Sequence, residues 1–210
     1  MNYFEIFNKV LLELNYRAVQ TFDAIYKSEH KKILDAINRV NNEVLASYEW
    51  DFLEKQTLLD VLEGQNTYQL PFKGCIKAVY KDSERVLYTA NSEDLLSGKL
   101  RGNYYSTARN SIIVSKPIKT EVYRIIYEGR NFAMGQNGEF KERLTAKDDS
   151  SVLPMPFAEH ILVYGACLKV KANPSYPKFG FWNTMYIQAL ANLLQKSPQT
   201  KECEPFINLA

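Results

Sequence analysis

The sequence is poor in the residues that most often carry chemistry. Its 210 residues include only two histidines, His30 and His160, and three widely spaced cysteines, Cys75, Cys167 and Cys203. Histidine is the commonest general base and metal ligand. Three cysteines without a CxxC pair fit neither a zinc site nor a disulfide framework. We therefore expect no metal, no cofactor and no catalytic residue, in a protein of a reducing compartment.

An excess of charge of either sign is also missing. The chain has 26 basic and 24 acidic side chains, a formal net charge of +2. That balance argues against a protein that coats DNA or binds a membrane through a polybasic surface. The start of the sequence, MNYFEIFNKVLLELN, has no basic region or cleavage site of a signal peptide, and charges interrupt its apolar residues. We expect a chain that is cytosolic where it is made.

Motifs that bind phosphate or calcium are not found either. Gly129, Gly135 and Gly138 do not form a GxGxxG or GxxxxGK loop, and Asp148-Asp149 lacks the alternating oxygen ligands of an EF-hand. We interpret the aspartate pair as part of a solvated loop. Glycoside hydrolysis needs only two carboxylates, so a hydrolase stays an alternative.

Aromatic residues, by contrast, are plentiful, with 14 tyrosines and 11 phenylalanines. Tyrosine suits wet interfaces, although a β-rich core uses the same residues. One stretch has the composition of a groove that stacks nucleic-acid bases or contacts a neighbouring protein. It contains Lys99, Arg101, Tyr104, Tyr105 and Arg109. The low net charge favours the alternative, an ordinary exposed pair of strands.

Apolar residues recur at helical spacing near both ends of the chain. The spacing predicts helices over residues 3–15, 28–50, 157–172 and about 182–193. Between them, β-forming stretches punctuated by turns predict about six short strands, with a hairpin turn at Gly64-Gln65-Asn66. Residues 129–156 form the longest polar run, and we expect this segment to be mobile in the free subunit.

Each predicted helix has one apolar face, so packing the helices of the two ends together would bury those faces. We predict an α+β fold: a bundle of long helices from both chain ends with an inserted antiparallel β domain, a small sandwich or barrel. The predicted divisions are a helical bundle (1–51 and 154–197), a β domain (52–130), a long polar loop (131–153) and a C-terminal tail (198–210).

Several of these stretches together resemble a known family. They are YEWDFLEKQTLLDVLEGQNTYQLP after a long helix, then IKAVY, IIYEG, a polar loop and LPMPFAEHILVYGACLKVKANP. The pattern is similar to that of tailed-phage head-to-tail adaptor (connector) proteins of the tail tubular protein A or short-tailed-phage head-completion type. It covers roughly residues 28–195.

The resemblance implies a structural virion protein at the head–tail junction, made in the bacterial host cytoplasm. Such a protein forms a ring of about twelve copies, built from heterologous contacts, that extends and seals the DNA channel. Its partners would be the portal protein, tail or nozzle proteins, and passing double-stranded DNA without sequence recognition; no membrane is involved. The alternatives are a virion-associated enzyme, such as a cell-wall hydrolase, and a nucleic-acid-binding module.

Two further groups of residues acquire a role from the resemblance. The apolar end of the tail, Pro205, Phe206, Ile207 and Leu209, would dock on the portal or another partner. The aromatics Tyr48, Trp50 and Phe52 would fix the angle at which the β domain leaves the helical bundle.

Overall fold

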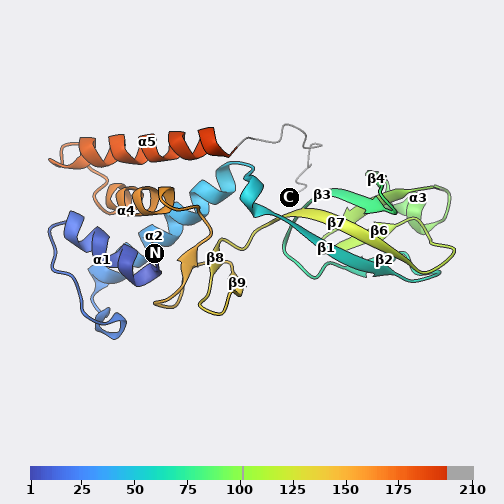
Figure 1. Ribbon diagram of the computed structural model, residues 1–210, viewed down its shortest axis with the longest axis horizontal. Coiled ribbons are helices and arrows are strands. Elements are labelled where there is room, and N and C mark those ends of the chain that lie inside the picture. Colours follow the sequence, from blue (N-terminus) through green and yellow to red (C-terminus); the bar gives the residue numbers. More distant parts are fainter. Residues whose placement is uncertain (101, 198–210) are drawn as a thin grey trace. The chain divides into compact units, whose positions relative to one another are not determined.

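The computed structural model describes residues 1–100 and 102–197, which form two compact units (Figure 1). The first unit comprises Met1–Phe52 and the described residues from Asn131 onward. The second comprises Leu53–Arg130. Each unit is described by itself below.

Four α-helices form most of the first unit (Figure 1). The apolar spacing of the sequence places all four approximately where they occur. The helix α1 begins with a capping box, in which Asn2 and Glu5 each accept a hydrogen bond from the other's backbone N–H, both at 2.9 Å. The helices are α1 (Tyr3–Glu13), α2 (Ser28–Ser47), α4 (Phe157–Val170) and α5 (Phe179–Lys196), with the short 3-10 turns η1 (Phe22–Ala24) and η2 (Asp51–Leu53).

The helix α4 lies at the centre of this unit and packs against α1, α2 and α5. It is apolar on nearly all sides, as expected of a helix surrounded by others. Gly165 allows the closest approach: a Cβ atom there would lie 2.7 Å from Cγ1 of Val40 and 3.0 Å from Cε2 of Tyr186. The absence of a side chain at Gly165 therefore lets α2 and α5 pack tightly against α4.

The first unit also contains a small three-stranded sheet, formed within the stretch that the sequence presents as a polar loop. Its strands are β8 (Ala133–Met134), β9 (Phe140–Lys141) and β10 (Ser150–Ser151), in the order β10-β8-β9. The backbone N–H of Tyr3 donates to the carbonyl of Asp149 at 2.7 Å, and that of Phe4 donates to Lys147 at 3.1 Å. These bonds satisfy backbone donors at the start of α1, which have no partner within the helix.

The second unit is a seven-stranded, nearly closed, barrel-like sheet with the order β1-β7-β3-β4-β5-β6-β2. The neighbours β4 and β5 are parallel, and a parallel pair needs a crossover connection, here carrying the short helix α3 (Ser92–Leu96). The strands are β1 (Glu54–Val61), β2 (Thr67–Gln69), β3 (Gly74–Lys81), β4 (Glu84–Tyr88), β5 (Tyr104–Ala108), β6 (Ser111–Val114) and β7 (Glu121–Gly129).

One apolar core fills the second unit. The hydroxyl of Tyr68 reaches out of this core to the turn after β1, where it accepts from the N–H of Leu62 at 2.7 Å and lies 3.0 Å from the carbonyl of Gln65. The buried members are Val61, Tyr68, Leu70, Ile76, Val79, Val86, Tyr105, Ile112, Val114, Tyr123 and Ile125.

The predicted fold class, a bundle of long helices from both ends with an inserted antiparallel β domain, is wrong. The helices have only 11, 20, 14 and 18 residues, and a three-stranded sheet completes their unit. The large sheet is mixed, not antiparallel, because β4 and β5 run in the same direction. The prediction of a helix bundle failed because polar contacts also hold the first unit together. Asparagines of α2 form hydrogen bonds with residues 131–153, so packing of apolar helix faces is not the whole basis of this unit.

The hairpin predicted at Gly64-Gln65-Asn66 is also wrong. The chain does turn there, but β1 pairs with β7 and β2 pairs with β6, so the two strands occupy opposite ends of the sheet order. The turn instead bonds to the β6–β7 connection, since the N–H of Gly64 donates to the carbonyl of Pro117 at 3.1 Å. Turn residues show where a chain reverses, but they do not determine which strands pair.

Candidate interaction surfaces

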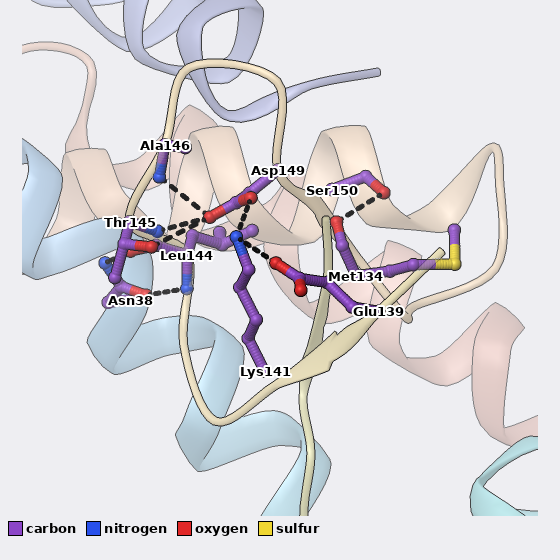
Figure 2. Close-up of polar contacts among 9 residues, drawn as sticks. All are labelled: Asn38, Met134, Glu139, Lys141, Leu144, Thr145, Ala146, Asp149 and Ser150. Atoms are coloured by element: carbon purple, nitrogen blue, oxygen red, sulfur yellow. Dashed lines mark hydrogen bonds and ion pairs between the residues drawn. The ribbon is translucent and has the colours of Figure 1, made fainter. Parts of the chain in front are cut away.

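A buried carboxylate organises residues 131–153 of the first unit (Figure 2). Asp149 is only 1% exposed. Its Oδ2 accepts from the backbone N–H groups of Thr145 and Ala146, each at 2.7 Å, and its Oδ1 lies 3.0 Å from Nζ of Lys141. That ammonium also pairs with Glu139 at 3.0 Å. The interpretation of Asp149 as part of a solvated loop is therefore wrong, because the loop folds around this carboxylate.

The electrostatics of Asp149 follow from these contacts. Burial by itself would raise the pKa of the carboxyl, because it disfavours the charged form. The hydrogen bonds from Ala146 and Thr145 and the ammonium of Lys141 outweigh burial and hold the pKa of Asp149 below its usual value. The carboxylate is thus ionised at neutral pH and acts as a structural anion.

Two asparagines of α2 attach this segment to the helices. Asn38 accepts from the N–H of Leu144 at 2.9 Å and donates to the carbonyl of the same residue at 3.0 Å. Asn41, fully buried, donates to the carbonyl of Phe132 at 3.0 Å and accepts from the hydroxyl of Ser151. Sequence reasoning missed both residues. The available signal was their position on the apolar face of a predicted helix, where an uncharged polar residue requires a partner.

Further contacts tie α5 to α1. Nε1 of Trp182, which is fully buried, donates to Glu13 at 3.0 Å, and Nζ of Lys178 donates to the carbonyl of Glu13 at 2.9 Å. An ion pair joins Lys9 of α1 to Glu159 of α4. The four helices and the small sheet are therefore held together as one body.

The outer surface of α5 is unusually free of charge. Residues 179–195 contain no Asp, Glu, Lys or Arg, although 24% of the whole chain is charged. Three of its side chains are buried, Trp182, Ala189 and Leu193, while Phe181 and Ile187 are 52% and 55% exposed. Depletion of charge together with exposed apolar residues is typical of the centre of a protein interface.

Two neighbouring hollows lie alongside α4. One, of about 140 Å³, is lined by α1 residues including Leu12 and by His160 and Tyr164 of α4. The other, of about 240 Å³, is lined by Phe157 and His160 of α4 and by Met185, Gln188, Ala189 and Asn192 of α5. His160 lines both hollows, which therefore lie side by side along α4. Phe181 of α5 extends this surface, with its ring edge-to-face on Tyr164 at 5.6 Å.

The second unit has a larger cavity, of about 740 Å³, beside the β6–β7 connection. Lys81 and Glu121 line it as an ion pair at 2.8 Å. Lys116 and Lys119 flank Ile118, which at 91% is the most exposed large apolar side chain among the described residues. This connection thus displays an apolar side chain between two cations.

The three aromatics predicted to form a joint contact one another. Trp50 is 1% exposed, and its Nε1 donates to the carbonyl of Val44 at 3.1 Å. Its ring lies 5.3 Å from that of Tyr48 and 5.4 Å from that of Phe52. The cluster lies where the first segment of the first unit ends in the sequence. Its role in fixing the angle at which the β domain leaves the helical bundle stays a prediction.

The residues predicted to contact DNA or a neighbour differ in their surroundings. Tyr105 lies in the core with 5% exposure. Tyr104 begins β5 while Arg109 lies in the turn after it, about 16 Å further along at the rise of a strand. Lys99 is exposed, and Arg101 lies outside the described residues. A contact through Lys99, Tyr104 and Arg109 stays a prediction.

Two residues of reactive types, Cys167 and His30, pack against other side chains of the first unit. Burial raises the pKa of the Cys167 thiol to about 12, so it is inert at neutral pH. His30 packs edge-to-face on Phe7. Across residues 1–100 and 102–197, no three His, Cys, Asp or Glu residues gather as metal ligands would. The tail residues Pro205, Phe206, Ile207 and Leu209 lie outside the described part of the chain.

Comparison with known proteins supplies the family. None of the curated proteins matches the chain, and none of its described helices is long and apolar enough to cross a membrane. The family described as SU10 adaptor protein matches residues 1–202, nearly the entire sequence. The resemblance to phage adaptor proteins is thereby confirmed. The chain belongs to the SU10 adaptor protein family and is a structural adaptor protein of a phage virion.

Proposed function

We propose that the protein forms an oligomeric adaptor ring between the portal and the tail of a phage particle, and that this ring extends and seals the DNA channel. The observation that carries the proposal is the family match over residues 1–202, which includes both units. The partners would be about eleven further copies in a cyclic arrangement, the portal protein and tail or nozzle proteins. Double-stranded DNA would pass without sequence recognition. We include in this proposal the narrower assignment of the chain to the tail tubular protein A or short-tailed-phage head-completion type.

The chemistry of the first unit supports a structural role. A ring closes only if every copy presents its contact surfaces at the same relative positions. The bonds of Glu13 to α5, the ion pair of Lys9 with Glu159 and the attachment of Asn38 to Leu144 hold those surfaces on one body. The polar groups of this unit serve cohesion in place of catalysis.

Particular residues have assigned roles in the proposal. The apolar tail residues Pro205, Phe206, Ile207 and Leu209 would dock on the portal, each copy adding a modest contribution that multiplies around a ring. Tyr48, Trp50 and Phe52 would hold the start of the connection to the second unit. Lys99, Tyr104 and Arg109 would contact a neighbour or the passing DNA.

The test is a binding experiment with portal-bearing capsids. The full-length protein is mixed with them, unbound protein is removed by sedimentation, and the particles are imaged by electron microscopy. We expect a ring of added density at the portal vertex and a fixed number of copies per particle. Failure to bind the portal vertex, together with activity on peptidoglycan, would replace the proposal with the cell-wall hydrolase alternative.

A further inference from the structure

The helix α5 has one row of buried side chains, and a different apolar surface lies on each side of that row. At 3.6 residues per turn, Trp182, Ala189 and Leu193 face the rest of the unit. On one flank lie Ile187, Leu190 and Leu194, spaced i, i+3 and i+7, which we call the α5 ridge. Ile187 is 55% exposed and the two leucines are partly exposed.

The opposite flank is concave. There Met185 of α5 and Phe157, His160 and Tyr164 of α4 line the two neighbouring hollows described above, and Phe181 of α5 borders them through its contact with Tyr164; we call this surface the α4–α5 groove. Leu12 of α1, 58% exposed, lines its far end. In Figure 1, α5 lies along the outside of its unit with α4 beneath it, so both flanks border the surface.

Four charged residues beside the groove have partners within the unit, and the ammonium of Lys196 lies over the ring of Phe157 at 5.3 Å. Lys9 pairs with Glu159, and Glu13 accepts hydrogen bonds from Trp182 and Lys178. The α5 ridge lies in a stretch without any charged residue. An uncharged ridge therefore fits this groove without burying an unpaired charge, which would be costly.

We propose that a second copy of this chain fills the α4–α5 groove with its α5 ridge. An apolar stripe at i, i+3 and i+7 is the form in which a helix lies in a groove. The ridge and the groove are different surfaces on opposite flanks of one helix, so the contact is heterologous, and a contact of this type propagates around a ring.

This inference rests on the proposed function, because it assumes the proposed ring and identifies the contact between neighbouring copies in it. It is tested by placing a photo-crosslinking amino acid at position 187 of the full-length protein and assembling it into particles. We expect a crosslink between two copies, mapped to the groove peptides that contain Leu12 or residues 157–164. The same label at Thr184, between the two flanks of α5, should give at least tenfold less of that product.

Two charge variants provide the second measurement. Ile187→Glu in the ridge and Phe181→Glu in the groove should each lower incorporation into particles at least tenfold, while Thr184→Glu is incorporated normally. Because all three side chains are exposed, the circular dichroism spectra should match that of the unmodified protein. Crosslinks from position 187 only to the portal or to a tail protein, or normal incorporation of both variants, would overturn the inference.

If the protein is not a virion adaptor, the experiments give a different result. In that case the protein is missing from purified particles, and crosslinking is carried out on the concentrated full-length protein in solution. A copy-to-copy crosslink between ridge and groove there would uphold the contact without the adaptor role, and its absence would remove both.

Discussion

Asn38 and Leu144, which are 106 residues apart, form two hydrogen bonds with each other: the amide of Asn38 accepts from the backbone N–H of Leu144 at 2.9 Å and donates to its carbonyl at 3.0 Å. The side chain thus replaces the partner that a neighbouring strand would provide. Because Leu144 is 2% exposed, solvent cannot substitute for Asn38. Asn38 is therefore one of the two asparagines of α2 that attach the segment 131–153 to the helices.

The first prediction follows from this pair. Asn38→Ala should lower the free energy of unfolding by about 1–3 kcal/mol, because it leaves buried backbone groups of Leu144 without a partner. Urea denaturation monitored by circular dichroism measures the change. Arg39→Ala is the matched control on the same helix: its side chain is 70% exposed, so the loss of its ion pair should cost less than about 0.5 kcal/mol. Equal effects of the two substitutions would contradict the attachment role of Asn38.

The second prediction concerns pH. The pKa of Asp149 is lower in the folded protein than in the unfolded chain, so its contribution to stability is complete above the unfolded value of about 3.9. That contribution is lost as the pH falls below this value and through the lower, folded pKa. Asp149→Asn should be less stable than the unmodified protein at pH 7, and the difference should shrink below pH about 4.

Thermal unfolding measured between pH 2 and pH 7 tests this difference. Asp148→Asn serves as the control, since its side chain is 38% exposed and should change the pH profile little. A stability gap between Asp149→Asn and the unmodified protein that stays constant down to pH 2 would show that folding does not lower the pKa of Asp149.

The third prediction concerns Trp50. Trp50→Ala should destabilise the protein by about 3–5 kcal/mol, since it removes a large buried aromatic ring, whereas Trp50→Phe keeps most of the packing and loses the bond to Val44, about 1 kcal/mol. Guanidinium denaturation measures both. Tyr26→Ala, at a site 71% exposed, is the neutral control. An unchanged denaturation midpoint for Trp50→Ala would refute the structural importance of the aromatic cluster.

The fourth prediction corrects the expectation that residues 129–156 are mobile in the free subunit. The backbone N–H groups of Leu144, Thr145, Ala146 and Asp149 all donate hydrogen bonds within the first unit. Hydrogen exchange of the free, full-length protein should therefore show these amides protected, because protected amides exchange only when their local structure opens. Asn38→Ala should accelerate exchange at Leu144 more than at β3, which belongs to the other unit. Rapid exchange throughout 131–153 would restore the original expectation.

The fifth prediction concerns the tail, which lies outside the described residues. Deleting residues 199–210 should leave a folded, soluble protein that attaches poorly to portal-bearing capsids, because the truncation removes Phe206, Ile207 and Leu209. Burial of each side chain would stabilise a contact by roughly 1.5–3 kcal/mol before ordering costs. Cosedimentation with capsids measures attachment, and Lys201→Ala in the full-length chain is the control. Normal attachment of the truncated protein would eliminate the tail as the portal contact.

Local periodicity in the sequence was sufficient to predict the helices of this protein. The spacing of Tyr3, Phe7 and Val10 placed α1, and the spacing of Ile33, Ile37 and Val40 placed α2, because an amphipathic helix must show an apolar residue every three or four positions. The pattern of aromatic, glycine and proline residues also identified a phage adaptor. These features depend on residues that lie close together in the sequence.

The contacts between distant segments, by contrast, depend on the folding of the whole chain. The partners of β1 and β2 are β7 and β6, a choice made by the closure of the whole sheet and not by the turn at Gly64. In the same way, Asp149 appeared to belong to a solvated loop because its partners are backbone N–H groups, and every residue except proline carries such a group. Backbone partners leave no mark on the sequence, so the burial of Asp149 and its ionisation became visible only once the chain was folded.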